Sequence, residues 1–306
     1  MPHAPDSRIT EQRNPRTASI DLASALEIVD LINAEDARVA AAVHTQRLEI
    51  ARTIELVERA FRLGGRLLYV GAGTSGRLGV LDASECPPTF GVEPEMVQGI
   101  IAGGTAALTR SQEGAEDRPD DGADAINERA VGANDVVVGI AASGTTPYVH
   151  AALRRARERG AKTVLLACTP LGPTIVSEVD IAIVPIVGPE VITGSTRMKS
   201  GTATKMVLNM ITTGAMIRVG KTYGNLMVDL RASNVKLRDR GERIVMELCA
   251  LERAAARDLL MRASGRVKLA IVMNARGLSA EQAQTALDLS SGVIRQLLPD
   301  APPPVP

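Results

Sequence analysis

The chain has 306 residues, of which 45% are hydrophobic and 2% aromatic, with no tryptophan. The hydrophobic fraction suffices for a globular core and excludes a wholly disordered chain. Lys and Arg together number 35, as do Asp and Glu. This balance excludes a general attraction to nucleic acid or to acidic membranes, and so few aromatic residues disfavour the stacking of single-stranded bases. Any anion must therefore be held by a local site.

Cysteine and histidine are sparse. Cys86, Cys168 and Cys249 lie far apart in the sequence, and the three histidines are equally scattered. This spacing predicts reduced, intracellular thiols rather than a disulfide framework, and it offers no pattern of metal ligands. Residues 1–10 lack the apolar segment of a secretory signal, and no apolar run approaches the ~20 residues that cross a membrane. We therefore expect a cytoplasmic protein with no metal, no nucleic-acid partner and no membrane partner.

The first sixty residues are predicted to form a polar arm and two helices. Residues 1–20 are polar, whereas apolar side chains recur with helical spacing in residues 21–63. The polar stretch 33–36 is the expected break between the two helices, and Gly64-Gly65 is the expected end of the second.

Strands and helices alternate in the middle of the chain, which predicts an α/β fold with a parallel sheet covered on both faces. Short apolar runs are typical of buried strands. Five such strands are expected, at residues 66–70, 96–102, 135–142, 162–168 and 180–187. Helical patterns include residues 146–159 and 197–219.

Beyond about residue 224 the strand pattern stops, and a small helical C-terminal domain is expected. Residues 242–263 and 280–298 are amphipathic, with breaks at Gly265 and Gly277. The proline-rich tail cannot continue a helix and is expected to be disordered. The expected parts are an N-terminal arm with helices, a sheet domain, the helical domain and the tail, at residues 1–56, 57–224, 225–298 and 299–306.

Three segments rich in Gly, Ser and Thr follow predicted strands, at the edge of a parallel sheet where ligands bind. The first, residues 71–77, reads GAGTSGR. Its glycines permit a tight turn that brings backbone N–H groups near an anion, and the helix start adds partial positive charge. A dinucleotide fingerprint is disfavoured because the acidic residues some twenty positions on, Glu93 and Glu95, precede a predicted strand rather than follow one. A Walker loop is excluded because no Gly-Lys-Ser/Thr ends the segment.

The second segment, ASGTTP, surrounds Gly144 with the hydroxyls of Ser143, Thr145 and Thr146 just before a helix. Thr146 is suited to cap that helix, with Pro147 at its first position. A capped turn without any ligand explains this segment equally well when it is taken alone. Two such segments on adjacent strand ends favour a phosphate cradle of hydroxyls and backbone amides.

The third segment, residues 193–205, is rich in hydroxyls and cations and leads into an apolar helix. Arg197 or Lys199 could reach a carboxylate or a phosphate. An ordinary helix start with solvated charges is the alternative.

Two acidic residues follow the first two predicted strands. Glu85 lies at the end of the helix after the first segment, where Pro87-Pro88 is expected to force a sharp exit and to hold the carboxylate rigidly. Glu116 follows the second strand. A single carboxylate among 35 acidic residues is ordinarily a surface charge, so the pattern alone does not place these two in one pocket.

Five stretches of the sequence are distinctive. They are TEQRN at 10–14, VGAGTSGR at 70–77, LDASECPPTFG at 81–91, EGAED at 113–117 and VGPEVITGSTR at 187–197. Together with the loops on the parallel sheet they resemble the SIS, or sugar isomerase, domain, and more specifically the N-acetylmuramic acid 6-phosphate etherases. The resemblance extends from about residue 10 to about residue 298.

This resemblance implies a fold, a partner and residue roles. Residues 57–224 would be a SIS domain that binds a sugar phosphate, with a helical appendage, in a homodimer. Five residues would hold the phosphate through hydroxyls or backbone amides: Ser75, Ser143, Gly144, Thr145 and Thr146. The family's two catalytic acids would fall on Glu85 and Glu116.

The reaction implied by the resemblance removes the D-lactyl group of N-acetylmuramic acid 6-phosphate in cell-wall amino-sugar recycling. The C1 aldehyde of the open-chain sugar acidifies the C2 proton. A carboxylate can therefore remove that proton while a carboxylic acid protonates the departing lactate oxygen, and water then adds. By analogy with the family, Glu116 is the base and Glu85 the acid, although the sequence itself leaves their order open. No cofactor is required.

Two alternatives would use the same domain. An aldose–ketose isomerase also needs a carboxylate beside C1 and C2, but the stretch around Glu85 with its two prolines disfavours it. A binding module such as the glucokinase regulatory protein is disfavoured because such regulators carry two SIS halves, whereas this chain has room for one. The group that stabilises charge at C1 stays open among Arg197, Lys199 and loop amides.

Overall fold

The computed structural model describes residues 8–230 and 235–298. The chain forms two compact units, Met1–Ser84 with Glu95–Thr212 and Glu85–Pro94 with Thr213–Pro306. Within the described residues, no helix is both long and apolar enough to cross a bilayer.

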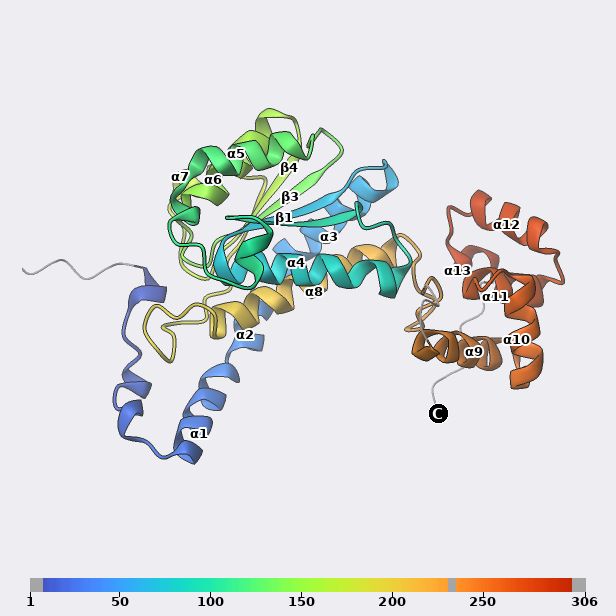
Figure 1. Cartoon of the computed structure of the whole chain (residues 1–306), viewed down its shortest axis with the longest axis horizontal. Coiled ribbons are helices and arrows are strands. Elements are labelled where there is room, and N and C mark those ends of the chain that lie inside the picture. The colour runs from blue at the N-terminus through green and yellow to red at the C-terminus, as the bar shows by residue number, and fades with distance from the viewer. Residues whose placement is uncertain (1–7, 231–234, 299–306) are drawn as a thin grey trace, which may run out of the picture. The chain divides into compact units, whose positions relative to one another are not determined.

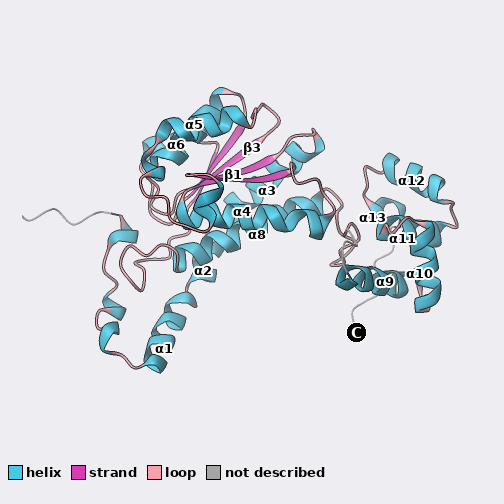
Figure 2. Cartoon of the chain, in the orientation of Figure 1, coloured by secondary structure: helices cyan, strands magenta, loops and turns pink. Residues whose placement is uncertain are grey.

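A five-stranded parallel sheet forms the centre of the first unit (Figure 2). Its strands are β1 (Leu67–Gly71), β2 (Val97–Ile101), β3 (Val136–Ile140), β4 (Lys162–Leu166) and β5 (Ile181–Ile183). They lie in the order β2-β1-β3-β4-β5. All five predicted strands are present. Most are shorter than predicted because the apolar runs continue into buried loop residues such as Ala141 and Cys168.

Helices cover both faces of the sheet (Figure 1). On one face lie α5 (Pro119–Glu128), α6 (Pro147–Glu158) and α7 (Pro173–Ser177), which share a buried cluster with the strands. On the other face lie α3 (Arg47–Arg62) and parts of α4 (Gly73–Phe90) and α8 (Lys199–Arg218). Every residue of β1 and β3 is buried, as expected for central strands of a sheet covered on both faces. The predicted α/β architecture is confirmed.

The helix break predicted near residues 33–36 lies at residues 37–38. Helix α1 (Ala25–Asp36) includes the polar stretch and ends with it, and α2 (Val39–His44) follows before α3 begins. Glu35 is part of the helix although it is polar, because it is buried and its carboxylate pairs with Arg16 and Lys199. The third helix ends before Gly64-Gly65, as predicted.

The polar N-terminal segment is packed against the protein over its described part. It forms three 3-10 turns, η1 (Ile9–Glu11), η2 (Pro15–Thr17) and η3 (Ile20–Leu22). Asn14 Nδ2 donates to Pro189 O at 3.2 Å, and Thr17 Oγ1 donates to Val191 O at 2.8 Å. The arm predicted for residues 1–20 is therefore anchored at these residues, while residues 1–7 lie outside the described part.

Helix α4 ends close to its two prolines, although both lie inside it. The helix continues past Pro87 and Pro88 to Phe90. A proline in a helix removes a hydrogen bond to the preceding turn. Each of the two therefore lacks one such bond, and the helix extends only two residues beyond Pro88. Gly91 ends the helix with φ of +62°, and its N–H donates to Pro87 O at 2.9 Å.

The second unit is helical, as predicted. Its helices are α9 (Val235–Cys249), α10 (Arg253–Arg262), α11 (Val267–Arg276), α12 (Ala280–Leu289) and α13 (Ile294–Leu297), around a shared apolar cluster. Gly265 and Gly277 separate helices, which confirms both predicted breaks. Two further breaks, at 250–252 and near Gly292, divide the predicted helices 242–263 and 280–298. The predicted disordered tail, 299–306, lies outside the described residues.

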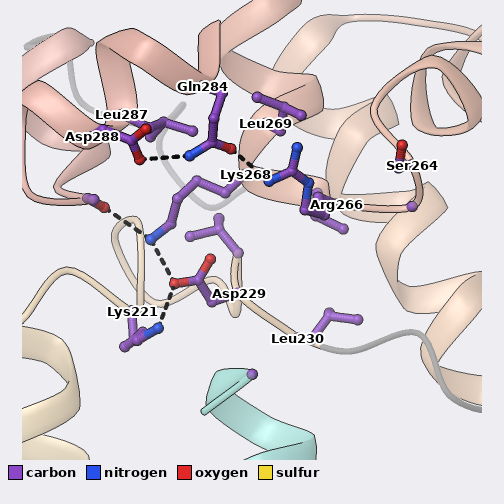
Figure 3. Close-up of a pocket in the computed structure, with 15 residues that line it drawn as sticks. Lys221, Asp229, Leu230, Ser264, Arg266, Lys268, Leu269, Gln284, Leu287 and Asp288 are labelled. Carbon is purple, nitrogen blue, oxygen red and sulfur yellow. Dashed lines mark hydrogen bonds and ion pairs between the residues drawn. The ribbon is translucent and has the colours of Figure 1, made fainter. Parts of the chain in front are cut away.

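A buried lysine joins three segments of the second unit, and Figure 3 shows its contact with one of them, at Asp229. The ammonium of Lys268 donates to Asp229 Oδ2 at 2.6 Å, to Gly220 O at 2.8 Å and to Gly292 O at 2.9 Å. Burial lowers the pKa of Lys268, and the carboxylate of Asp229 opposes that effect. Because Gly220, Asp229 and Gly292 belong to separate segments, Lys268 fixes how these segments meet.

We predict that Lys268→Met destabilises the second unit. Methionine has a similar length but leaves two carbonyls and part of the Asp229 carboxylate without their donor, so the loss should be about 3–5 kcal/mol. Urea unfolding of the variant measures this loss. Lys236→Met, at an exposed position in α9, is the matched control and should change little. Equal stability of the two variants would contradict the role assigned to Lys268.

Candidate active site

Three connections leave the sheet from the same edge. The last residues of β2, β1 and β3 are paired in register, Ile101 with Gly71 and Gly71 with Ile140. The segments that follow these strands therefore start side by side. They carry most of the predicted site residues: Ser75, Glu116, Ser143, Gly144, Thr145 and Thr146.

The first segment turns directly from β1 into α4. A side chain on Gly71 would lie 2.7 Å from the nitrogen of Gly76, and one on Gly76 would lie 2.7 Å from the oxygen of Gly71. Only glycine at both positions allows the backbone to fold back this closely. Ser75 lies in the first turn of α4 and is half-buried.

The second segment gathers three hydrogen-bond donors. The hydroxyls of Ser143 and Thr145 lie 3.2 Å apart, and the N–H of Thr145 donates to Ser143 Oγ at 3.4 Å. Gly144 has φ of +72°, and a side chain there would lie 2.6 Å from Leu171 Cδ2. The positive φ therefore favours glycine, and a larger residue would also require Leu171 to shift.

The start of α6 agrees in part with the prediction. Thr146 is the residue before the helix and Pro147 is its first residue, as predicted. Within the described residues, however, the Thr146 hydroxyl makes no capping bond. The N–H of Gly144 donates to Ala141 O at 2.8 Å inside the turn.

The two candidate acids lie on different elements. Glu116 is exposed in the 3-10 turn η5 (Ala115–Asp117), which packs against α6, the helix that follows the second segment. Glu85 is exposed on α4 and belongs to the second unit. Within the first unit, Glu116 therefore lies on a turn that contacts α6, and its place at the predicted phosphate cradle stays a prediction.

The third segment uses its lysine internally. Lys199 is 0% exposed and donates to Glu35 Oε2 at 2.6 Å and to Val187 O at 2.9 Å. Lys199 therefore contacts a carboxylate, but this carboxylate is the side chain of Glu35 and not part of a substrate. Arg197 is exposed. Sequence reasoning missed Glu35, because its partner lies 164 positions away.

Two buried carboxylates hold the start of α8. Glu35 also accepts bonds from the Arg16 guanidinium and from Asn14 Nδ2, and these contacts, led by Arg16, lower its pKa to about 2. Glu190 accepts the N–H groups of Lys199 and Ser200, each at 2.9 Å. A carboxylate is favourable at a helix N-terminus because it bonds free amides there and meets the positive end of the helix dipole.

A third carboxylate joins α4 and α8 to the sheet. Asp82 accepts bonds from the Tyr69 hydroxyl at 3.0 Å and from Thr212 Oγ1 at 3.3 Å, and burial raises its pKa. It precedes Glu85 by one helical turn on α4.

Among the described residues, no three His, Cys, Asp or Glu side chains gather so as to hold a metal ion.

Comparison with known proteins places the chain in a family. The model of the glucokinase regulatory protein N-terminal SIS domain matches residues 49–157, and the SIS domain model matches residues 121–214. The N-acetylmuramic acid 6-phosphate etherase of Crocosphaera subtropica is 54% identical, over 95% of this chain and 95% of that protein. The etherase of Gloeobacter violaceus is 56% identical over 94% and 93%, and that of Edwardsiella ictaluri is 54% identical over 96% and 97%. The chain belongs to the N-acetylmuramic acid 6-phosphate etherase family.

Membership of the etherase family confirms the resemblance inferred from the sequence, and the SIS matches confirm the predicted fold. All seven residues predicted for the etherase site lie within residues 49–157, the range of the first SIS match. The start of α8, which Glu35 and Glu190 hold, lies within the second match.

We predict that Glu35→Gln lowers the free energy of unfolding by about 3–5 kcal/mol at neutral pH, because Lys199 is left buried without its counter-charge. The folded pKa of about 2 lies below the ordinary value of 4.5. The carboxylate therefore stabilises the fold above about pH 4.5, and this contribution is lost as the pH falls towards 2.

Urea unfolding between pH 7 and pH 3 tests this dependence. The difference between wild type and Glu35→Gln should shrink as the pH falls below 4.5. Glu55→Gln, at an exposed position on α3, should match wild type throughout. A difference that stays constant with pH would show that Glu35 acts through packing alone.

Proposed function

We propose that this chain cleaves the D-lactyl ether of N-acetylmuramic acid 6-phosphate and produces N-acetylglucosamine 6-phosphate and D-lactate. The observation that carries the proposal is identity of 54–56% over nearly the full length of three proteins named as etherases of that substrate. The gathered donors of the second segment support it, because a phosphate ester needs several donors at one point.

The phosphate would bind where the first and second segments leave the sheet. The Ser143 and Thr145 hydroxyls and the Thr145 amide already lie within hydrogen-bond range of one another, so a phosphate oxygen can replace their mutual contacts. Ser75 and Thr146 would add hydroxyls from the neighbouring helix starts. Gly144 shapes the turn, and because its N–H already bonds Ala141, we assign the stronger amide contact to Thr145.

The chemistry would be an elimination followed by hydration. Removal of the C2 proton by Glu116 gives an enolate conjugated with the C1 aldehyde. Expulsion of the C3 oxygen, protonated by Glu85, then releases lactate and leaves an unsaturated aldehyde. Water adds to C3 with Glu85 as base, and C2 regains a proton from Glu116. Each general acid or base step contributes ~10²–10⁴-fold.

This scheme requires one ionised and one protonated carboxyl in the same site, as in other enzymes with two catalytic carboxyl groups. It moves protons without electron transfer, so it needs no redox cofactor. The position of η5 against α6 supports Glu116 as the group nearer the sugar phosphate. The order of the two acids follows the family analogy.

We also propose that the enzyme is a cytoplasmic homodimer that acts in amino-sugar recycling. A sugar phosphate is an intracellular metabolite, and a free cysteine such as the buried Cys168 suits a reducing compartment. Leu22, Leu26 and Val29 are exposed on the N-terminal segment. Exposed apolar side chains of this kind commonly pack against another subunit.

We predict that Glu85→Ala and Glu116→Ala each reduce D-lactate release by at least ~100-fold, since each removes a proton-transfer group. In heavy water, Glu85→Ala should still exchange the C2 proton for deuterium, whereas Glu116→Ala should lose exchange as well. Mass spectrometry of the sugar phosphate and an enzymatic lactate assay measure both steps.

Glu95→Ala, at an exposed position before β2, is the control and should keep wild-type turnover. Exchange that survives in Glu116→Ala but not in Glu85→Ala would reverse the two roles. Undiminished lactate release from both variants would remove both residues from the mechanism. A wild type that forms a ketose and no lactate would establish the isomerase alternative instead.

A further inference from the structure

A histidine outside the proposed chemistry contacts the second segment. His150 lies on α6, and its Nε2 is 2.8 Å from the carbonyl oxygen of Gly144. A carbonyl oxygen can only accept, so Nε2 carries the hydrogen and donates. This role is open to the neutral ring and to the imidazolium alike. His150 is half-buried.

The hydrogen bond from His150 fixes both the carbonyl of Gly144 and the orientation of the peptide to which it belongs. The Gly144–Thr145 peptide bond is trans, so the carbonyl of Gly144 and the N–H of Thr145 point in opposite directions across one plane. With the carbonyl held by His150, the N–H of Thr145 points away from the histidine. It points towards the hydroxyl of Ser143, at 3.4 Å.

The peptide that His150 restrains, between Gly144 and Thr145, could rotate readily without this hydrogen bond. Glycine has no Cβ, so steric contacts restrain the ψ of Gly144, which sets the orientation of the peptide that follows, less than they would at another residue. The N–H of Gly144 is fixed by Ala141 O at 2.8 Å. His150 fixes the other side of the residue, and together they select the peptide orientation that turns the Thr145 amide towards the hydroxyls.

We propose that His150 is a positioning residue that orients the Thr145 N–H towards the phosphate of the substrate. This inference rests on the proposed function, which places the phosphate at the second segment. His150 itself touches neither the phosphate nor the reacting carbons. Its loss therefore weakens ground-state and transition-state binding alike, which raises KM and leaves kcat in place.

The experiment compares wild type with His150→Ala, His150→Gln and His44→Ala. The glutamine amide can donate from about the place of Nε2, so His150→Gln is the rescuing variant. His44 is exposed on α2 and serves as the matched control. The measurements are kcat and KM for D-lactate release, the Kd of N-acetylglucosamine 6-phosphate by titration calorimetry, and Tm.

We expect His150→Ala to raise KM and Kd about 3- to 10-fold, the range of one net hydrogen bond. Its kcat should stay within about twofold of wild type. His150→Gln should recover most of the affinity, and His44→Ala should match wild type in both constants. A purely structural role would lower Tm without this split between KM and kcat.

Two results overturn the inference. One is an unchanged KM and Kd in His150→Ala. The other is a loss of kcat at unchanged Kd, which would make His150 a proton-transfer group. If wild type binds the sugar phosphate but releases no lactate, the proposed function fails and the Kd values alone decide the role of His150. If wild type binds no sugar phosphate at all, both proposals fail.

Discussion

The carboxylate of Glu35 and the ammonium of Lys199 are both buried, and neither could be buried without the other. Each charge taken out of water costs several kcal/mol unless a partner and further hydrogen bonds compensate. Here the compensation comes from distant parts of the chain. Arg16 and Asn14 bond Glu35 from the N-terminal segment, while Val187 accepts from Lys199. The fold of the first unit therefore depends on these segments meeting in one arrangement.

This arrangement bears directly on the proposed active site. Glu190 bonds the first amides of α8 at the residue that carries the buried ammonium. A side chain on Gly201, in the first turn of that helix, would lie 3.6 Å from Thr74 Cγ2 of the first segment. The ionic network thus fixes the start of α8 beside the first segment. Because the ammonium of Lys199 is used in this network, the proposed phosphate site relies on the hydroxyls and amides of the first two segments.

Much of this was predictable because it depends on local pattern. Runs of apolar residues predicted all five strands, and the composition of residues 71–77 and 142–147 predicted loops at one edge of the sheet. The long stretch LDASECPPTFG made the family recognisable. These features depend on neighbours in sequence, whose effects add up within a short window.

What the sequence did not reveal depends mainly on contact over long sequence distance. Glu35 has the polarity of a surface residue, yet it is buried because a lysine from another part of the chain pairs with it. Lys199 was a candidate to bind substrate because the residues around it in the sequence do not reveal its contact with Glu35. The prolines Pro87 and Pro88 lie inside α4, which ends two residues later at Phe90. The contact between His150 and Gly144 is local, but no motif in the sequence announced it.

The central claim is that the ether is broken by elimination and the sugar is then hydrated. The most direct test is turnover of N-acetylmuramic acid 6-phosphate by the wild-type protein in water enriched in oxygen-18. Elimination sends the ether oxygen away with lactate and takes the new C3 hydroxyl from water. The account therefore predicts the label in the C3 hydroxyl of N-acetylglucosamine 6-phosphate and unlabelled lactate. Label in the lactate hydroxyl instead would mean that water attacks the lactyl carbon, and it would contradict the assigned roles of Glu85 and Glu116.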